Sequence, residues 1–245
     1  MAESLTFNMD CMEAMKRFPD KYFDLAVVDP PYGINADKFN NGAGAKDHGK
    51  GQSTTQKLRV KGRLNTGSGK LKDRILNQSD CSWDSEPPPK EYFEELFRVC
   101  QNCIIWGGNY FDLPPTRGII VWDKVQPWEN FSQVELAWTS FDRPAALFKY
   151  CNAGGASPER KIHPTQKPVA LYEWIFKRYA KRGMKILDTH LGSGSSRIAA
   201  YNAGLDFWGY EINKMYFDMQ EERFQKHASQ QNLFLLNDQE EMNLL

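Results

Sequence analysis

The sequence predicts an α/β fold with an open, mostly parallel sheet, and three observations support this prediction. Short apolar runs of strand length alternate along the 245 residues with segments whose apolar side chains recur at helical spacing. One apolar run, residues 23–28, ends in the tetrapeptide Asp-Pro-Pro-Tyr. Another, residues 184–187, leads through a glycine-containing turn into a helical pattern. Open α/β sheets bind ligands at the carboxyl ends of their strands, where both of these polar segments are expected.

Seven strands and four helices are expected from these patterns. Asp10 can cap the first helix, three prolines precede the second, and Pro168 suits the first position of the third. The runs at residues 118–122 and 133–139 are close enough in sequence to form a hairpin, so one antiparallel strand is expected. The expected strands span residues 5–9, 25–28, 102–106, 118–122, 133–139, 184–187 and 206–210, and the expected helices span 11–18, 90–100, 168–182 and 197–202.

The tetrapeptide is formed by Asp29, Pro30, Pro31 and Tyr32. The prolines bring no N–H, so the carboxylate of Asp29 and the carbonyl of Pro30 offer mainly acceptors, while Tyr32 offers a flat ring. Such a slot suits a planar heterocycle with an exocyclic amine, which favours group transfer to the amino nitrogen of a nucleobase. Taken alone, the same letters are equally typical of a tight turn that closes a buried strand.

The second signal is the turn that follows residues 184–187. Asp188 ends the strand, Gly192 and Gly194 let the backbone pass close to a ligand, and the next helix presents free N–H groups. Glu211 ends the following strand, where a carboxylate can hold two ribose hydroxyls. The glycine turn alone is compatible with any nucleotide-binding fold, but together with residues 29–32 it indicates a nucleotide cofactor beside an amine slot.

These segments resemble the DNA amino-methyltransferases that use S-adenosylmethionine. Residues 29–32 look like their catalytic motif, residues 188–194 like their cofactor loop, and residues 163–168 (His-Pro-Thr-Gln-Lys-Pro) are similar to a segment that precedes this loop in the permuted subgroup. In that subgroup, as here, the half of the chain with the catalytic motif precedes the half with the cofactor loop. The resemblance implies a Rossmann-like, circularly permuted, seven-stranded methyltransferase fold with one antiparallel strand, in which the third and fourth family strands (residues 5–9 and 25–28) lie side by side.

The resemblance also implies roles for individual residues. Asp29 would accept hydrogen bonds from the amine of a flipped base and would also touch the cofactor, with Tyr32 as the stacking surface. No metal is required, because the sulfonium is already an activated electrophile, and the product would be S-adenosylhomocysteine. The cofactor-binding residues implied in this way are Asp10 (adenine), Thr165 and Lys167 (methionine carboxylate), Asp188, Gly192 and Gly194 (methionine part) and Glu211 (ribose).

Three functions remain open at this point. An acidic first residue in the catalytic motif favours N6-methylation of adenine in DNA, whereas N4-methylation of cytosine and methylation of an RNA base use the same slot chemistry. A non-catalytic nucleotide-sensing or DNA-binding module is disfavoured, because both motifs are intact.

Charge is distributed unevenly although the chain carries 31 basic and 31 acidic residues. Residues 36–74 hold ten basic and three acidic residues, a net charge of +7, which leaves −7 for the rest. This segment is polar and glycine-rich, so within a single domain of residues 1–245 we expect residues 36–80 to be a flexible DNA-binding insertion, or else a solvated one. The expected DNA-binding residues are Lys46, Lys50, Lys57, Arg59, Lys61, Arg63, Lys70 and Lys72.

Composition favours a cytoplasmic protein. No apolar stretch has the length of a membrane span, and the first residues lack a signal-peptide pattern. Five cysteines fit a reducing compartment, and the Cys100-x-x-Cys103 pair is better read as small core residues than as a metal or redox site. The sequence leaves open the target site, a homodimer, a cognate restriction endonuclease and the role of residues 230–245.

Overall fold

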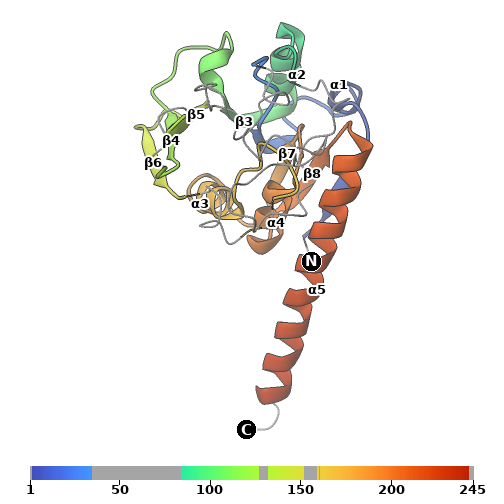
Figure 1. Cartoon of the computed structure of the whole chain (residues 1–245). Helices are drawn as coiled ribbons and strands as arrows, with labels where there is room; N and C mark the ends of the chain where they lie inside the picture. The colour runs from blue at the N-terminus through green and yellow to red at the C-terminus, as the bar shows by residue number, and fades with distance from the viewer. Residues whose placement is uncertain (1, 35–83, 127–131, 152–158, 160, 243–245) are drawn as a thin grey trace, which may run out of the picture.

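The computed structural model describes residues 2–34, 84–126, 132–151, 159 and 161–242, and the account below concerns these residues. Their strands form a single eight-stranded sheet of order β1-β8-β7-β2-β3-β5-β4-β6 (Figure 1). β5 runs antiparallel to both of its neighbours, and the other strand pairs are parallel. The expected α/β fold with one antiparallel strand is therefore confirmed. The eight strands are β1 (Ser4–Phe7), β2 (Phe23–Val28), β3 (Cys100–Trp106), β4 (Ile119–Asp123), β5 (Val134–Thr139), β6 (Ala146–Lys149), β7 (Lys185–Asp188) and β8 (Asp206–Tyr210).

Helices cover both faces of the sheet and form two apolar cores. On one face, α3 (Val169–Tyr179) and α4 (Ser195–Asn202) pack on the strands through residues such as Leu171 and Ile175. On the other face, α1 (Cys11–Met15) and α2 (Lys90–Val99) pack through residues such as Met15. Burial on both faces explains why the central strands read as continuous apolar runs.

The register of the parallel strands brings the polar segments to one edge of the sheet. β2 pairs with β7 through Leu25 and Ile186, and β7 pairs with β8 through Asp188 and Gly209. The carboxyl ends of β2, β7 and β8 therefore lie together. Asp29 follows the first of these ends, Asp188 closes the second and Glu211 follows the third.

Two expectations about the sheet are wrong. The strands at residues 5–9 and 25–28 are not neighbours, because β8 and β7 lie between β1 and β2. The sheet also has an eighth strand, β6, in a stretch where no strand was expected, and it pairs in parallel with β4 at the far edge. Short edge strands make few ladder bonds and bury one side only, so their sequence signal is weak.

α5 (Lys214–Met242) is the longest helix and was not expected from the sequence. Figure 1 shows its second half extending away from the body of the protein. Cys100 and Cys103 lie fully buried in the core on the α1–α2 face, with free thiols, as expected for small core residues. Among the described residues, no helix has both the length and the apolar character needed to cross a membrane.

Candidate active site

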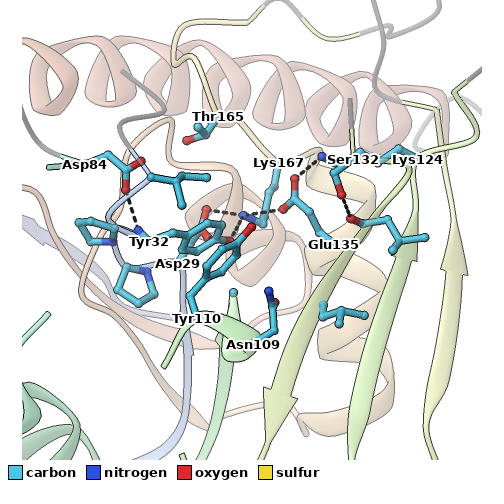
Figure 2. Close-up of a pocket in the computed structure, with 16 residues that line it drawn as sticks. Asp29, Tyr32, Asp84, Asn109, Tyr110, Lys124, Ser132, Glu135, Thr165 and Lys167 are labelled. Carbon is cyan, nitrogen blue, oxygen red and sulfur yellow. Dashed lines mark hydrogen bonds and ion pairs between the residues drawn. The ribbon is translucent and has the colours of Figure 1, made fainter. Parts of the chain in front are cut away.

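The Asp29 carboxylate lies at the carboxyl end of β2, where both of its oxygens have a partner. Tyr32 donates its hydroxyl hydrogen to Asp29 Oδ1 at 2.6 Å, and Lys167 Nζ lies 2.5 Å from Oδ2 (Figure 2). Burial raises the pKa of Asp29, while the ammonium of Lys167 and the hydroxyl of Tyr32 act in the opposite direction. The site therefore holds a desolvated carboxylate that depends on these two donors for its charge.

The backbone around Tyr32 is fixed by a buried carboxylate. Asp84, which is 1% exposed, accepts hydrogen bonds from the backbone N–H groups of Tyr32 at 2.6 Å and Gly33 at 2.9 Å. Gly33 has a positive φ of 74°, so it allows the chain to turn directly after the tetrapeptide. Asp84 thus holds the slot open in one backbone conformation.

The ring of Tyr32 lies against a glycine and a second aromatic ring. Gly107 has a φ of 71°, and a Cβ atom placed there would lie 2.2 Å from the Tyr32 ring. Tyr110, in the single turn Gly108–Tyr110, stacks on Tyr32 with centroids 4.9 Å apart and an interplanar angle of 13°. The loop after β3 therefore contributes to the slot as much as the tetrapeptide does.

A cavity of about 350 Å³ opens at this slot. We call it the first cavity; Figure 2 shows the side chains that line it. Its lining combines carboxylates, aromatic rings and lysines from the ends of β2, β3, β4 and β5, and includes Pro30 and Pro31. The labelled polar and aromatic lining residues are Asp29, Tyr32, Asp84, Asn109, Tyr110, Lys124, Ser132, Glu135, Thr165 and Lys167.

A second cavity of about 440 Å³ lies over the carboxyl ends of β7 and β8. The two cavities adjoin, because four lining residues are common to both. These shared residues are Asp29, Pro31, Thr165 and Lys167. A ligand in one cavity therefore meets a ligand in the other beside the Asp29 carboxylate.

Glu211 and Gly192 form the polar wall of the second cavity. Glu211 Oε2 accepts a hydrogen bond from the backbone N–H of Gly192 at 2.9 Å, and Oε1 accepts one from Asn213 at 2.8 Å. Each carboxylate oxygen has a second lone pair, which leaves acceptor capacity for two hydroxyl groups. Burial raises the pKa of Glu211, and these backbone bonds oppose that rise.

Another part of the lining is aromatic, and its histidines carry no charge. Burial lowers the pKa of His163 to about 3 and that of His190 to about 4, so both imidazoles are neutral at pH 7. His163 packs edge-on against Tyr216 with centroids 4.3 Å apart. Ile212, at 67% exposure, adds an apolar surface at the rim. A flat, largely apolar ligand with polar groups at one end fits this lining.

Asp188 is buried at the start of the glycine turn. It is 2% exposed, and it accepts hydrogen bonds from the Ser196 hydroxyl at 2.5 Å and from the backbone N–H of His190 at 3.1 Å. Burial raises the pKa of Asp188 to about 7 from an ordinary value of 3.8. It stabilises the turn by hydrogen bonds and does not line either cavity.

This shift predicts a pH-dependent stability. A carboxyl whose folded pKa exceeds its unfolded pKa stabilises most below the unfolded value, and this contribution is lost as pH rises through the folded value. We therefore expect the stability of the wild type relative to Asp188→Asn to fall between pH 4 and pH 7, by up to about 4 kcal/mol. Urea unfolding of both proteins at pH 4.5, 6 and 8 tests this, and parallel pH profiles would contradict it.

The structure separates the expected cofactor residues into two groups. Five of them line the second cavity: Asp29, Thr165, Lys167, Gly192 and Glu211. The other three, Asp10, Asp188 and Gly194, line neither cavity. Asp10 caps α1 through bonds from Met12 and Glu13, and Gly194, with φ of 72°, precedes α4 against Gln220.

Lys167 differs most from its expected place. It was expected at the methionine carboxylate, yet its side chain is 3% exposed and pairs with Asp29 and Glu135. The expected DNA-binding residues (Lys46, Lys50, Lys57, Arg59, Lys61, Arg63, Lys70 and Lys72) lie outside the described residues.

Four residues of the site were missed by sequence reasoning: Asp84, Gly107, Tyr110 and Glu135. The run Gly107-Gly108-Asn109-Tyr110 directly after a strand was the one available signal, because glycines at a strand end mark close approach of another group. Glu135 sits inside a predicted strand, where a charge is normally read as solvent-facing.

Comparison with known proteins finds similarity to DNA methyltransferases. The family described as "DNA methylase" (N6_N4_Mtase) matches residues 120–222. Type II methyltransferase M.BglII of Bacillus subtilis is 25% identical over 87% of this chain, and M.HpaI of Haemophilus parainfluenzae is 34% identical over 33% of it. These matches span 66% and 26% of the two relatives' own lengths.

Solved structures share the fold. The M1.HpyAVI–SAM complex superposes with a TM-score of 0.52 at 20% identity, over 91% of this chain and all of the other. PvuII DNA methyltransferase, described as cytosine-N4-specific, gives a TM-score of 0.55 at 12% identity, over 91% and 87% of the two chains. In its motifs, its relatives and its fold, the chain is similar to the S-adenosylmethionine-dependent DNA amino-methyltransferases, with the family model matching fewer than half of its residues.

Proposed function

We propose that this protein transfers a methyl group from S-adenosylmethionine to the N6 amine of an adenine flipped out of duplex DNA. The observation that carries the proposal is the pair of adjoining cavities that meet at Asp29. One has the polar wall and flat sides that a nucleoside needs, and the other has an acceptor beside stacked aromatic rings. A methyl donor and an amine can therefore be brought together at one carboxylate.

The residues of the second cavity fit the cofactor. Glu211 retains acceptor capacity for the ribose hydroxyls, and Gly192, with φ of 51°, lets the backbone approach the ligand. Thr165 offers a hydroxyl between the two cavities, and Ile212 offers a surface for the adenine ring. When bound, S-adenosylmethionine would supply an activated methyl group, so the protein need only align its acceptor.

Asp29 is the group that prepares the amine. The amino nitrogen of adenine is a poor nucleophile because its lone pair is delocalised into the ring. Hydrogen bonds from the amine to Asp29 and to the Pro30 carbonyl favour a more tetrahedral nitrogen with its lone pair directed at the methyl group. Catalysis then rests on alignment and preorganised acceptors, and the carboxylate takes the amine proton after transfer.

The two stacked tyrosines provide the surface for a flipped base. Because a base inside the duplex cannot reach the end of β2, it has to leave the stack, and an aromatic wall offsets part of the lost stacking. The Tyr32 ring is fixed for this role by its bond to Asp29 and by Gly107 behind it. Tyr110, 47% exposed, extends the aromatic surface toward solvent.

Cytosine N4 is the second candidate, because cytosine presents a similar amine and PvuII methyltransferase, named as specific for it, has the same fold. We favour adenine because the first residue of the catalytic tetrapeptide is acidic. Incubation of the enzyme with labelled S-adenosylmethionine and unmethylated duplex DNA, followed by nucleoside analysis, tests the choice. Asp29→Ala protein prepared in parallel controls for a contaminating methyltransferase.

N6-methyladenine as the labelled nucleoside would support the proposal. N4-methylcytosine would overturn the choice of base, although the transfer site would stand. Label in neither nucleoside, with the cofactor still bound in equilibrium dialysis, would overturn duplex DNA as the substrate and direct the search to RNA or single strands.

We also propose that the basic segment after the slot binds the DNA backbone, since it carries a net charge of +7 within residues 36–74. Removing residues 40–70 deletes seven lysines and arginines and should reduce the slope of log K against log salt by about 0.9 for each phosphate that is no longer neutralised. Titrations of duplex binding at several salt concentrations measure this. An unchanged slope would show that the segment neutralises no phosphate.

A further inference from the structure

A buried ammonium lies between two carboxylates at the junction of the cavities. Lys167 Nζ is 2.5 Å from Asp29 Oδ2 and 3.1 Å from Glu135 Oε2, and only 3% of the Lys167 side chain is exposed. These residues come from three distant segments: the end of β2, the strand β5 and the turn before α3. A buried charge is costly unless it is paired, so this arrangement is built by the fold.

Lys167 also lies beside two aromatic rings. Its ammonium is 5.2 Å from the ring centroid of Trp106 and 5.7 Å from that of Tyr32. Cation–π attraction of this kind adds to the two ion pairs, and the rings exclude water from the cation. Burial would lower the pKa of Lys167, but Asp29 and Glu135 outweigh it, so the ammonium stays charged.

Two donors together fix the Asp29 carboxylate. The Tyr32 hydroxyl holds Oδ1 at 2.6 Å and the Lys167 ammonium holds Oδ2. With both oxygens bound, the carboxylate plane cannot rotate, while each oxygen keeps a second lone pair for an amine. The ammonium also favours the ionised form of Asp29, and so opposes the rise in pKa that burial causes.

Glu135 holds the Lys167 ammonium in place. Burial would raise the pKa of Glu135, but Lys167 and Lys124 outweigh burial and lower it to about 2. Glu135 also pairs with Lys124, so the two carboxylates and the two ammonium groups of this cluster balance in charge.

We propose that Lys167 is a positioning residue for methyl transfer, which orients the Asp29 carboxylate and favours its ionised form, and that Glu135 anchors it. This inference rests on the proposed function, in which Asp29 accepts the amine. It replaces the expectation that Lys167 binds the methionine carboxylate, because its two close partners are protein carboxylates.

The first test needs neither DNA nor cofactor. Carbon-13 NMR titration of the Asp29 carboxyl compares the wild type with Lys167→Met, which keeps the length and apolar stem of the side chain. We expect the Asp29 pKa to be higher in Lys167→Met by about one unit or more, because the opposing cation is gone. An unchanged Asp29 titration in the folded variant would overturn the proposal, whatever the protein methylates.

The second test measures single-turnover methyl transfer against pH with saturating cofactor. The rate should fall as pH drops through the Asp29 pKa, and in Lys167→Met this limb should move to higher pH, with a rate at pH 7 lower by about 10- to 100-fold. Cofactor affinity in equilibrium dialysis should change by less than about threefold. A tenfold or larger loss of cofactor affinity with an unmoved limb would identify Lys167 as a cofactor ligand and overturn the proposal.

The double variant Glu135→Gln, Lys167→Met tests whether Glu135 acts through Lys167. If Glu135 acts through Lys167, the double variant should transfer methyl at the rate of Lys167→Met alone, whereas additive losses would show that Glu135 acts independently and would overturn its role. Lys185→Met is the matched control, because Lys185 also lies over an aromatic ring, 4.0 Å from that of Tyr22, but at the opposite end of the sheet. Its rate and its pH limb should equal those of the wild type.

Discussion

Replacing Asp29 with alanine is expected to reduce methyl transfer by at least about a thousandfold, because the amine then loses the acceptor that aligns its lone pair. The variant should still fold. Lys167 keeps Glu135 as a partner at 3.1 Å, so the buried ammonium is not left alone. Single-turnover transfer of labelled methyl to unmethylated duplex measures the loss.

Cofactor binding separates this result from general damage to the site. Asp29 lines both cavities, but the acceptor wall of the second is formed by Glu211. Asp29→Ala should therefore bind S-adenosylmethionine within about threefold of the wild type, whereas Glu211→Gln should lose affinity by about tenfold or more. Transfer by Asp29→Ala at a tenth of the normal rate or faster would show that another group aligns the amine.

The sequence was informative where function depends on residues close together in the chain. Asp29 and Tyr32 lie within four positions at a strand end, and the hydrogen bond between them is local. The parallel order of the strands then brings Asp188 and Glu211 to the same edge, which follows from the general geometry of such sheets. The α/β fold and the cavity beside Asp29 could therefore be predicted.

Residues that act through the tertiary structure could not be found in this way. Asp84 holds Tyr32 across a separation of more than fifty residues, and Glu135 meets Lys167 only because β5 inserts antiparallel beside β3. A glutamate within a strand usually faces solvent, so its burial beside a lysine is not visible in the sequence. The role of Lys167 could not be predicted for the same reason, because its partners come from β2 and β5.

Gly107→Ala is expected to be the most damaging single-methyl change near the site. Gly107 has a φ of 71°, and its added Cβ would lie 2.2 Å from the Tyr32 ring, which is far inside van der Waals contact. The ring cannot move aside freely, because its hydroxyl is bound to Asp29 and its face stacks on Tyr110. We expect methyl transfer to fall by about a hundredfold or more, since small displacements at a reacting centre have effects of this size.

Backbone strain alone is measured by a matched control. Gly183 has a similar φ of 82°, but an added Cβ meets nothing within 4 Å. Gly183→Ala should therefore lose about 1–2 kcal/mol of stability and no activity, while Gly107→Ala should lose both. Urea unfolding and single-turnover transfer of the two variants make this comparison, and equal activities would show that the Tyr32 ring can yield.

Removing the Tyr32 ring tests whether this ring is what an alanine at position 107 clashes with. If Gly107 is required because of the Tyr32 ring, then Gly107→Ala in a Tyr32→Ala background should cost no more stability than Gly183→Ala does in the wild type. A full additive loss in that background would place the constraint on the backbone of the loop after β3. The predicted coupling means that a backbone position in this loop and an aromatic side chain in the tetrapeptide form one structural unit, which holds the flat wall of the base slot beside the Asp29 carboxylate.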